Sequence, residues 1–154
     1  MSDPIYIAEY DALIREVLAS GGEFRLYPHG TSMLPLIRQG IDSVALRSLD
    51  RPPQKFDILF YQRKDGSYIL HRVKEASSKG LVLWGDNHTM LEYGITEENI
   101  IGYAARIFRD EKELDCHGFG YRMYLWLWQF KAIRDLVLPI AYHLRKEIDS
   151  NAEY

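Results

Sequence analysis

Hydrophobic positions along the chain repeat with two different periods, and the period changes twice. Residues 5–19 carry apolar side chains at three- and four-residue spacing up to Gly21-Gly22, which predicts an amphipathic helix. From Glu23 to Phe108 short runs alternate apolar and polar residues, a pattern typical of β strands. Helical spacing returns over 121–148, where Pro139 is expected to kink or divide the helix. The pattern predicts an N-terminal helical segment (1–22), a β domain (23–110) and a C-terminal helical appendage (111–154).

The middle region contains six predicted strands separated by turn residues. We place them at 24–26, 44–46, 56–61, 68–74, 81–84 and 100–108. Lys64-Asp65-Gly66-Ser67 and Ser77-Ser78-Lys79-Gly80 have the composition of hairpin turns, in which glycine supplies a positive φ. The predicted fold class is therefore mainly β, built chiefly of antiparallel hairpins.

Composition excludes several classes of function. The 154 residues include 19 basic and 22 acidic side chains, a net charge of −3, so the basic excess of a nucleic-acid-binding domain is missing. Cys116 is the only cysteine, which rules out an internal disulfide and a thiolate zinc cage. No metal-ligand spacing of histidines occurs, and we expect neither a metal nor another cofactor.

The start of the chain has no signal-peptide pattern. It lacks a basic n-region, and charged residues interrupt the apolar positions that follow, so we expect a cytoplasmic location. Charges at Lys131, Arg134 and Asp135 interrupt the later apolar run and argue against a membrane span there.

Three stretches carry candidate chemistry. Ser32 follows a predicted strand and a glycine bend, where backbone N–H groups can stabilise an oxyanion; alternatively it is the N-cap of a short helical turn. Strand alternation places His71 on one face with Ile69 and Val73, opposite Tyr68, Leu70 and Arg72. It is either a general base or a half-buried structural histidine.

The third stretch, Gly85-Asp86-Asn87 and the residues up to Glu92, offers two carboxylates. Either Asp86 or Glu92 could orient the imidazole of His71 and stabilise its protonated form. Gly-Asp-Asn is also a common turn composition, so a structural role for Asp86 is the alternative.

Taken in order, four motifs resemble the type I signal peptidase family. They are Gly-Thr-Ser-Met-Leu-Pro at 30–35, His-Arg-Val at 71–73, Gly-Asp-Asn at 85–87 and Ile-Ile-Gly-Tyr at 100–103. The similarity covers roughly residues 24–108. It is closest to the Ser–His branch of endoplasmic-reticulum and archaeal enzymes, which the separation of Ser32 and His71 by 39 positions also resembles.

The resemblance implies a site and a fold. Ser32 would be the nucleophile, and His71 the general base, where bacterial signal peptidases and LexA-type self-cleaving repressors use lysine. Glu92 is preferred to Asp86 as the orienting acid. The Ser32 N–H would donate to the oxyanion from the loop that also holds Gly30, Thr31 and Met33, and the fold would be the coiled β architecture shared with LexA-type peptidase domains.

The implied function is a serine endopeptidase that cleaves a peptide or protein precursor after small residues. The alternative is a catalytically silent module on the same fold that binds peptides. Trp126 and Trp128, with the basic residues of 121–148, suit a peripheral contact with the inner face of a membrane; packing on the β domain or on a second subunit is the other interpretation. Homo-oligomerisation is left open.

Overall fold

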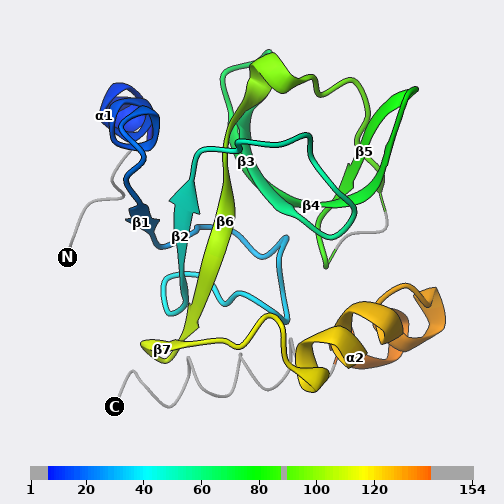
Figure 1. Ribbon diagram of the computed structural model, residues 1–154. Helices are drawn as coiled ribbons and strands as arrows, with labels where there is room; N and C mark the ends of the chain where they lie inside the picture. Colours follow the sequence, from blue (N-terminus) through cyan, green and yellow to red (C-terminus); the bar gives the residue numbers. More distant parts are fainter. Residues whose placement is uncertain (1–6, 88–89, 140–154) are drawn as a thin grey trace.

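The computed structural model describes residues 7–87 and 90–139, and within them the protein is mainly β (Figure 1). One antiparallel sheet of seven strands carries α1 (Ile7–Ala19) beside one end and α2 (Phe119–Leu127) near the other. A short 3₁₀ helix, Glu97–Asn99, directly precedes strand β6 (Ile100–Arg109). The predicted fold class, mainly β with helices before and after the sheet, is confirmed at this level.

The strand order joins segments that are far apart in the sequence. The strands are β1 (Phe24–Leu26), β2 (Ser43–Arg47), β3 (Ile58–Gln62), β4 (Tyr68–Ser77), β5 (Gly80–Trp84), β6 (Ile100–Arg109) and β7 (Lys112–Glu113). Their order is β1-β2-β6-β3-β4-β5, with β7 paired to β6. The hairpins β3–β4 and β4–β5 follow the sequence, whereas β6 lies between β2 and β3 and joins them into one sheet.

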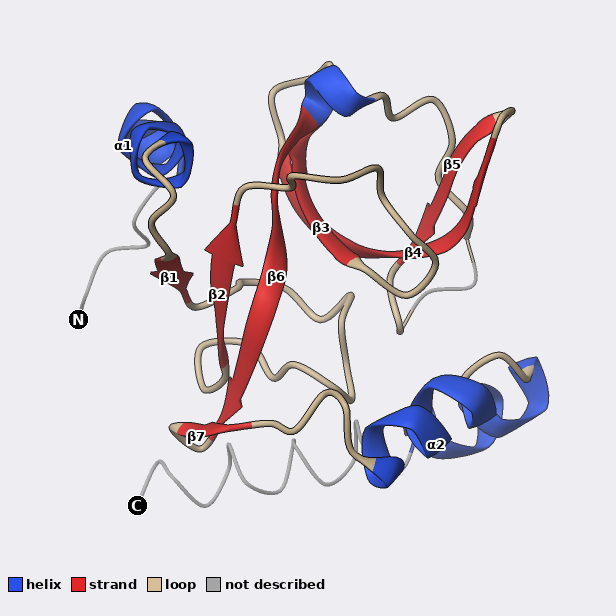
Figure 2. Ribbon diagram, viewed as in Figure 1, coloured by secondary structure: helices blue, strands red, loops and turns tan. Residues whose placement is uncertain are grey.

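Irregular pairing accompanies the curvature of the sheet. The register shifts between Ala45 and Leu46, between Phe60 and Tyr61, and between Val73 and Glu75, and such bulges bend strands and increase their twist. The β3–β4–β5 portion curls round on itself in Figure 2. Within this portion, the β4–β5 hairpin places Trp84, at the end of β5, opposite Arg72 in the middle of β4.

Two apolar clusters occupy the two faces of the sheet. The larger includes Ile14 and Leu18 from α1, Leu36 and Ile37 from the β1–β2 connection, and further strand residues (Val44, Leu46, Ile58, Phe60, Leu70, Ile101 and Ile107). The smaller, inside the curl, contains Leu59, Tyr61, Val73, Leu83 and Ile95. Tyr68 and Leu70 contact the first cluster, and Ile69 and Val73 belong to the second. The predicted alternation along β4 is therefore confirmed.

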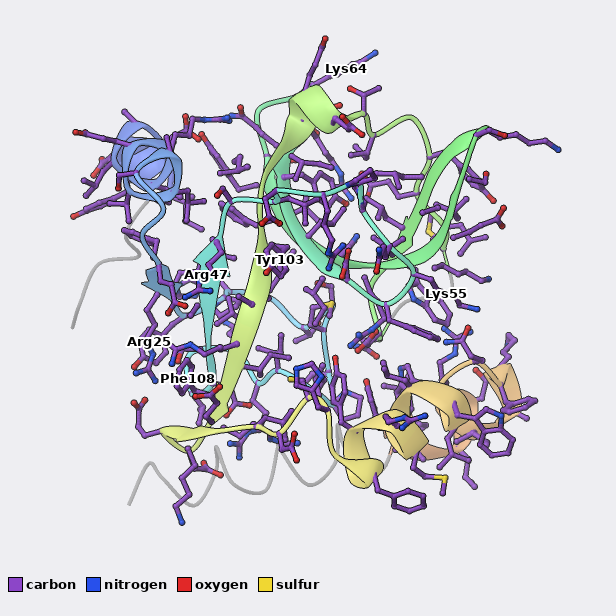
Figure 3. The ribbon with its side chains drawn as sticks, in the orientation of Figure 1. Arg25, Arg47, Lys55, Lys64, Tyr103 and Phe108 are labelled. Carbon is purple, nitrogen blue, oxygen red and sulfur yellow. The ribbon has the colours of Figure 1, made fainter. Side chains whose placement is uncertain are left out.

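Both predicted hairpin turns are present, and each uses a glycine with positive φ. Gly66 has φ 86° and donates its N–H to the Arg63 carbonyl at 2.9 Å, and Gly80 has φ 115° at the start of β5. At the opposite end of the sheet, the Arg25 guanidinium lies 4.2 Å from the centre of the Phe108 ring, and Figure 3 shows the two side chains together. Because Arg25 belongs to β1 and Phe108 to β6, the contact links two strands that are separated by β2 in the sheet.

Two predicted boundaries are wrong. The strand predicted at 56–61 begins at Ile58, because Phe56 has φ 81° and cannot continue an extended strand. The helix predicted over 121–148 is divided at 128–130: α2 ends after Leu127, and a second helical segment covers 131–139. The kink predicted at Pro139 falls at the edge of the described residues and stays a prediction. Residues 140–148 lie outside the described part. Over residues 7–87 and 90–139, no helix combines the length and apolarity needed to span a bilayer.

Candidate active site

Ser32 lies in the connection between β1 and β2, in a series of tight turns. The Leu34 N–H donates to the Thr31 carbonyl at 3.2 Å, and the Ile37 N–H donates to the Met33 carbonyl at 3.0 Å. Gly30, with φ 92°, begins the series, in a conformation that glycine adopts without the steric cost of a side chain. The Ile37–Met33 bond closes one helical turn directly after Ser32, whose side chain is half-buried.

His71 lies in the centre of β4. It is opposite Leu59 of β3 and is 6% exposed. On the same face of β4, Val73 belongs to the smaller apolar cluster and Ile69 packs against it, so little water reaches the imidazole along the strand.

Gly85 shows how close Ser32 and His71 lie. A Cβ atom placed on Gly85 would be 3.1 Å from the Ser32 Cβ and 3.2 Å from the His71 Nε2. The same point is 2.6 Å from the Ser32 carbonyl oxygen, closer than any real Cβ approaches. The serine and the Nε2 edge of the imidazole are therefore neighbours across a space that stays open because residue 85 has no side chain.

Asn87 fixes the turn after β5 to the serine loop. Its backbone N–H donates to the Ser32 carbonyl at 2.8 Å, and its side-chain Nδ2 donates to the Thr31 carbonyl at 3.0 Å. These two bonds hold the Gly85-Asp86-Asn87 turn against the loop that carries Ser32. The turn thus acts as a spacer between the serine and β4.

Glu92 faces the other nitrogen of the same imidazole. Two backbone hydrogen bonds with Leu83 of β5, at 2.8 and 2.9 Å, fix the position of Glu92. Its Oε2 lies 3.3 Å from the His71 Nδ1. His71 therefore has Ser32 beside Nε2 and a carboxylate beside Nδ1, an arrangement that a serine, a base and an orienting acid require.

Tyr61 and Arg63 of the β3 region complete the surroundings of Glu92. The Tyr61 hydroxyl donates to Glu92 Oε2 at 2.6 Å and lies 3.2 Å from the His71 Nδ1. Arg63 donates from Nε to Oε1 at 2.6 Å and from Nη2 to Oε2 at 2.7 Å. Burial raises the pKa of the Glu92 carboxyl, but the bonds from Arg63 and Tyr61 outweigh it and hold that pKa below its usual value.

Asp86, the alternative acid, is bonded elsewhere. Its carboxylate, wholly buried, accepts from Arg72 Nε at 2.8 Å and from Arg72 Nη2 at 2.7 Å. The Tyr124 hydroxyl donates to the same carboxylate at 2.7 Å. Arg72 is 1% exposed and also donates to the Phe56 carbonyl. The structure brings Glu92 to His71 and places Asp86 in a buried ion pair on the opposite side of β4.

The inner side of α2 contacts this ion pair. Besides the Tyr124 bond, the Trp128 indole N–H donates to the Asp86 carbonyl at 2.8 Å, and Arg72 Nη1 donates to the Tyr121 hydroxyl at 3.1 Å. The Tyr124 and Trp128 rings stack with their centres 5.0 Å apart. The appendage is therefore attached to the same turn that separates Ser32 from His71.

A small cavity of about 60 Å³ opens beside Ser32. Its walls come from the serine loop and from the first residues of β4: Pro28, His29, Gly30, Ser32, Met33, Ile37, Tyr68, Ile69 and Leu70. Met33 is buried in the larger cluster and forms part of the floor. A larger cavity of about 360 Å³, between the Pro52-Pro53 connection and the β4–β5 turn, contains none of the candidate residues.

Sequence reasoning missed Tyr61 and Arg63. The signal was available in the β3–β4 hairpin, because the turn at 64–67 sets a register in which Leu59 is opposite His71 and Tyr61 is opposite Ile69. Residues 59, 61 and 63 then share the face of His71. Tyr61 and Arg63 are two residues apart and lie on the same face as His71. Two polar side chains at this spacing indicate a buried polar network around the histidine.

The resemblance of the four sequence motifs to type I signal peptidases remains a prediction. No family model, no curated protein and no solved structure matches this chain.

Proposed function

We propose that the protein is a serine endopeptidase of signal-peptidase-like type, in which Ser32 is the nucleophile, His71 the general base and Glu92 the orienting acid. The observation that carries the proposal is the pair of distances at Gly85, 3.1 Å to the Ser32 Cβ and 3.2 Å to the His71 Nε2. The 3.3 Å separation of His71 Nδ1 and Glu92 Oε2 supports it. In the proposed fold, the curled sheet is the coiled β architecture of signal peptidases and LexA-type domains.

The chemistry follows from the position of each group. Ser32 Oγ attacks the peptide carbonyl while His71 Nε2 takes its proton, and the resulting imidazolium is stabilised by Glu92. The imidazolium then passes the proton to the leaving amine, and water resolves the acyl-enzyme. Backbone N–H groups of the loop from Gly30 to Met33, with that of Ser32 foremost, would donate to the oxyanion.

The surface beside Ser32 suits an extended peptide. β5 pairs with β4 only from Arg72 onwards, so within the described residues Tyr68–Leu70 have a strand partner, β3, on one side. An exposed strand edge can accept a peptide as an additional strand. The cavity of about 60 Å³ beside Ser32 would hold a small side chain, which supports cleavage after small residues.

Peptide hydrolysis tests the proposal directly. The full-length protein is incubated with peptides that contain Ala-x-Ala sites, and products are identified by mass spectrometry. Ser32→Ala should abolish cleavage, whereas Ser67→Ala, in the exposed turn before β4, should keep it. Equal cleavage by Ser32→Ala would refute the nucleophile.

The same edge supports a second candidate, a peptide-binding module without turnover. It predicts that the protein and its Ser32→Ala variant bind the same peptide with the same affinity, and that neither releases product. Isothermal titration with the Ala-x-Ala peptides separates the two candidates, because only the peptidase shows turnover that depends on Ser32.

The outer side of α2 supports a peripheral membrane contact. Four large apolar residues on this side of the helix and just after it, Phe119, Met123, Trp126 and Phe130, are 38–77% exposed. Arg122 is an exposed basic residue beside this face, whereas Lys131 is paired with Asp135 and Arg134 is buried. An aromatic face with an exposed basic residue suits an anionic bilayer surface.

A further inference from the structure

We propose that Tyr61 and Arg63 are positioning residues that fix His71 in the tautomer protonated at Nδ1, so that Nε2 presents a lone pair towards Ser32. The inference rests on the proposed function, since it assigns the residues that prepare the base. It can nevertheless be measured without any substrate.

The number of hydrogens at the Nδ1 side decides the tautomer. A phenol has one hydrogen, and Tyr61 donates it to Glu92 Oε2 at 2.6 Å. Towards His71 Nδ1, at 3.2 Å, the Tyr61 oxygen can then only accept. Glu92 Oε2, 3.3 Å from the same nitrogen, also only accepts. Nδ1 thus faces two acceptors, and its hydrogen bonds are made only if Nδ1 carries the proton.

The opposite tautomer, with an unprotonated Nδ1, would require Tyr61 to give up its stronger hydrogen bond, the one to Glu92. If Tyr61 donated to Nδ1, the carboxylate would lose its shortest contact with the phenol and would face a lone pair on Nδ1. A bond from a neutral donor to a carboxylate is stronger than one to a neutral acceptor, and the 2.6 Å and 3.2 Å separations follow that order.

Arg63 keeps the acceptors in place and charged. Its fork engages both oxygens of Glu92, which fixes the plane of the carboxylate and directs Oε2 at Nδ1. The Arg63 and Tyr61 bonds also lower the pKa of Glu92, so the carboxyl stays an acceptor at neutral pH. Burial and the neighbouring carboxylate raise the pKa of Tyr61, which therefore stays a phenol with a hydrogen to donate.

Burial makes the network the determinant of the tautomer. The side chains of His71 and Glu92 are 7% and 17% exposed, and Tyr61 is wholly buried, so water has little opportunity to replace a missing partner. Within residues 7–87 and 90–139, Nδ1 lies beside Tyr61 of β3 and Glu92 of the segment bridged to β5, and Arg63 lies behind Glu92. Ser32 and Gly85 lie beside the Nε2 edge.

Nitrogen NMR of the ¹⁵N-histidine-labelled full-length protein reads the tautomer. We expect the wild-type His71 to show a protonated Nδ1 and an unprotonated Nε2 above the pH at which it loses its charge. Tyr61→Phe and Arg63→Met should each give a mixture of tautomers. Wild-type protein protonated at Nε2, or variants that keep the wild-type tautomer, would overturn the inference.

Enzyme kinetics provide a second test, because kcat and the pH–rate profile should change only if Tyr61 and Arg63 act on His71 and not if they merely stabilise the fold. We expect Tyr61→Phe and Arg63→Met to lower kcat about 10-fold, the effect of losing one bond to a charged group, with KM unchanged. Arg63→Met leaves Glu92 unneutralised beside the imidazole and should move the acid limb of the pH–rate profile to higher pH, whereas Glu92→Gln should move it lower. Shifts in the same direction, or no shift, would count against the network.

The chain contains a matched control for Arg63. Arg51 donates two bonds to Asp57, at 2.7 and 2.9 Å, and its side-chain exposures (37% and 13%) are close to those of Arg63 and Glu92 (37% and 17%). Arg51→Met should match the stability loss of Arg63→Met without changing the tautomer or the pH profile. Arg63→Lys keeps the positive charge but loses the pair of parallel hydrogen bonds to Glu92. Its pH profile should therefore be close to that of the wild type, whereas its His71 should still show a mixture of tautomers.

The two proposals fail separately. A wild-type protein that cleaves no peptide but shows the Nδ1-protonated tautomer, lost in Tyr61→Phe, would end the peptidase proposal and keep the network. A protein that cleaves peptides through Ser32 with a tautomer insensitive to Tyr61 and Arg63 would do the reverse.

Discussion

Gly85→Ala tests the claim that Ser32 and the Nε2 edge of His71 can lie side by side because residue 85 has no side chain. The new methyl group would lie 2.6 Å from the Ser32 carbonyl oxygen, an atom fixed by the Asn87 N–H at 2.8 Å. Both backbone segments are held by this bond, so relieving the clash to an ordinary contact of 3.4 Å requires the serine loop to move away from residue 85 by about 0.8 Å. Overpacking of this kind costs about 1–3 kcal/mol of unfolding free energy.

The effect on turnover should exceed the effect on stability. The same methyl would lie between the Ser32 Cβ and the His71 Nε2, and a displacement near 1 Å at reacting groups lowers rates roughly 100-fold. We therefore expect kcat/KM, corrected for the folded fraction, to fall by about that factor. Chemical denaturation gives the folded fraction, and the peptide assay gives the rate.

Two other glycines supply matched controls. A Cβ on Gly102 would also lie 2.6 Å from a backbone oxygen, that of Arg47, so Gly102→Ala carries a similar steric cost in the sheet. A Cβ on Gly118 would meet the Asp115 carboxylate at the same distance, and that carboxylate cannot turn away without losing its bonds from the His117 and Gly118 N–H groups. Gly102→Ala and Gly118→Ala should therefore both lose stability and keep their turnover per folded molecule. If Gly85→Ala loses no more turnover than Gly102→Ala, the spacer argument is wrong.

Three further predictions follow from contacts described above. Arg72→Met should destabilise the fold by about 3–5 kcal/mol, because it leaves the Asp86 carboxylate buried without its partner; adding Asp86→Asn should recover part of that loss in the same denaturation experiment. Because the pKa of Glu92 is lowered by folding, its stabilising contribution is present above pH ~4.5 and disappears as the pH falls through the folded-state pKa; the stability difference between wild type and Glu92→Gln should therefore shrink on acidification. Vesicles containing anionic phospholipid should co-sediment with the protein, and Phe119→Ser with Trp126→Ser should abolish this without changing the melting temperature, because both side chains are exposed.

Each of these has a clear contrary result. Asp86→Asn that leaves the Arg72→Met variant no more stable would show that the cost does not come from an unpaired carboxylate. A stability difference for Glu92→Gln that grows below pH 4 would reverse the sign of the linkage. Binding to neutral vesicles as strongly as to anionic ones would remove the electrostatic part of the membrane proposal.

Local sequence patterns predicted the elements better than their connections. Alternation placed His71 on the face of Ile69 and Val73, and glycine marked both hairpin turns, because these features depend on neighbours within a few residues. The insertion of β6 between β2 and β3 was not predicted, since pairing between distant strands leaves no local pattern.

The choice between Asp86 and Glu92 depends on the same kind of distant contact. Glu92 reaches His71 because its backbone pairs with Leu83 after the chain has turned back, and Asp86 is taken by Arg72, whose burial no local pattern indicated. The division of the C-terminal helix at 128–130 was not predicted either. The Trp128 indole donates to the Asp86 carbonyl at this point, a tertiary contact that no local pattern indicates.

The adjacency of His71 and Arg72 on β4 has a practical consequence for mutational scanning. Successive side chains of a strand point to opposite faces, so one position carries the proposed proton carrier and the next carries the internal cation that anchors the turn and α2. A screen that scores only product would group both positions together as essential. Measuring the soluble yield together with the turnover of every variant would separate positions needed for catalysis from positions needed for folding. The same pair of measurements would classify each residue of the turn at 85–87.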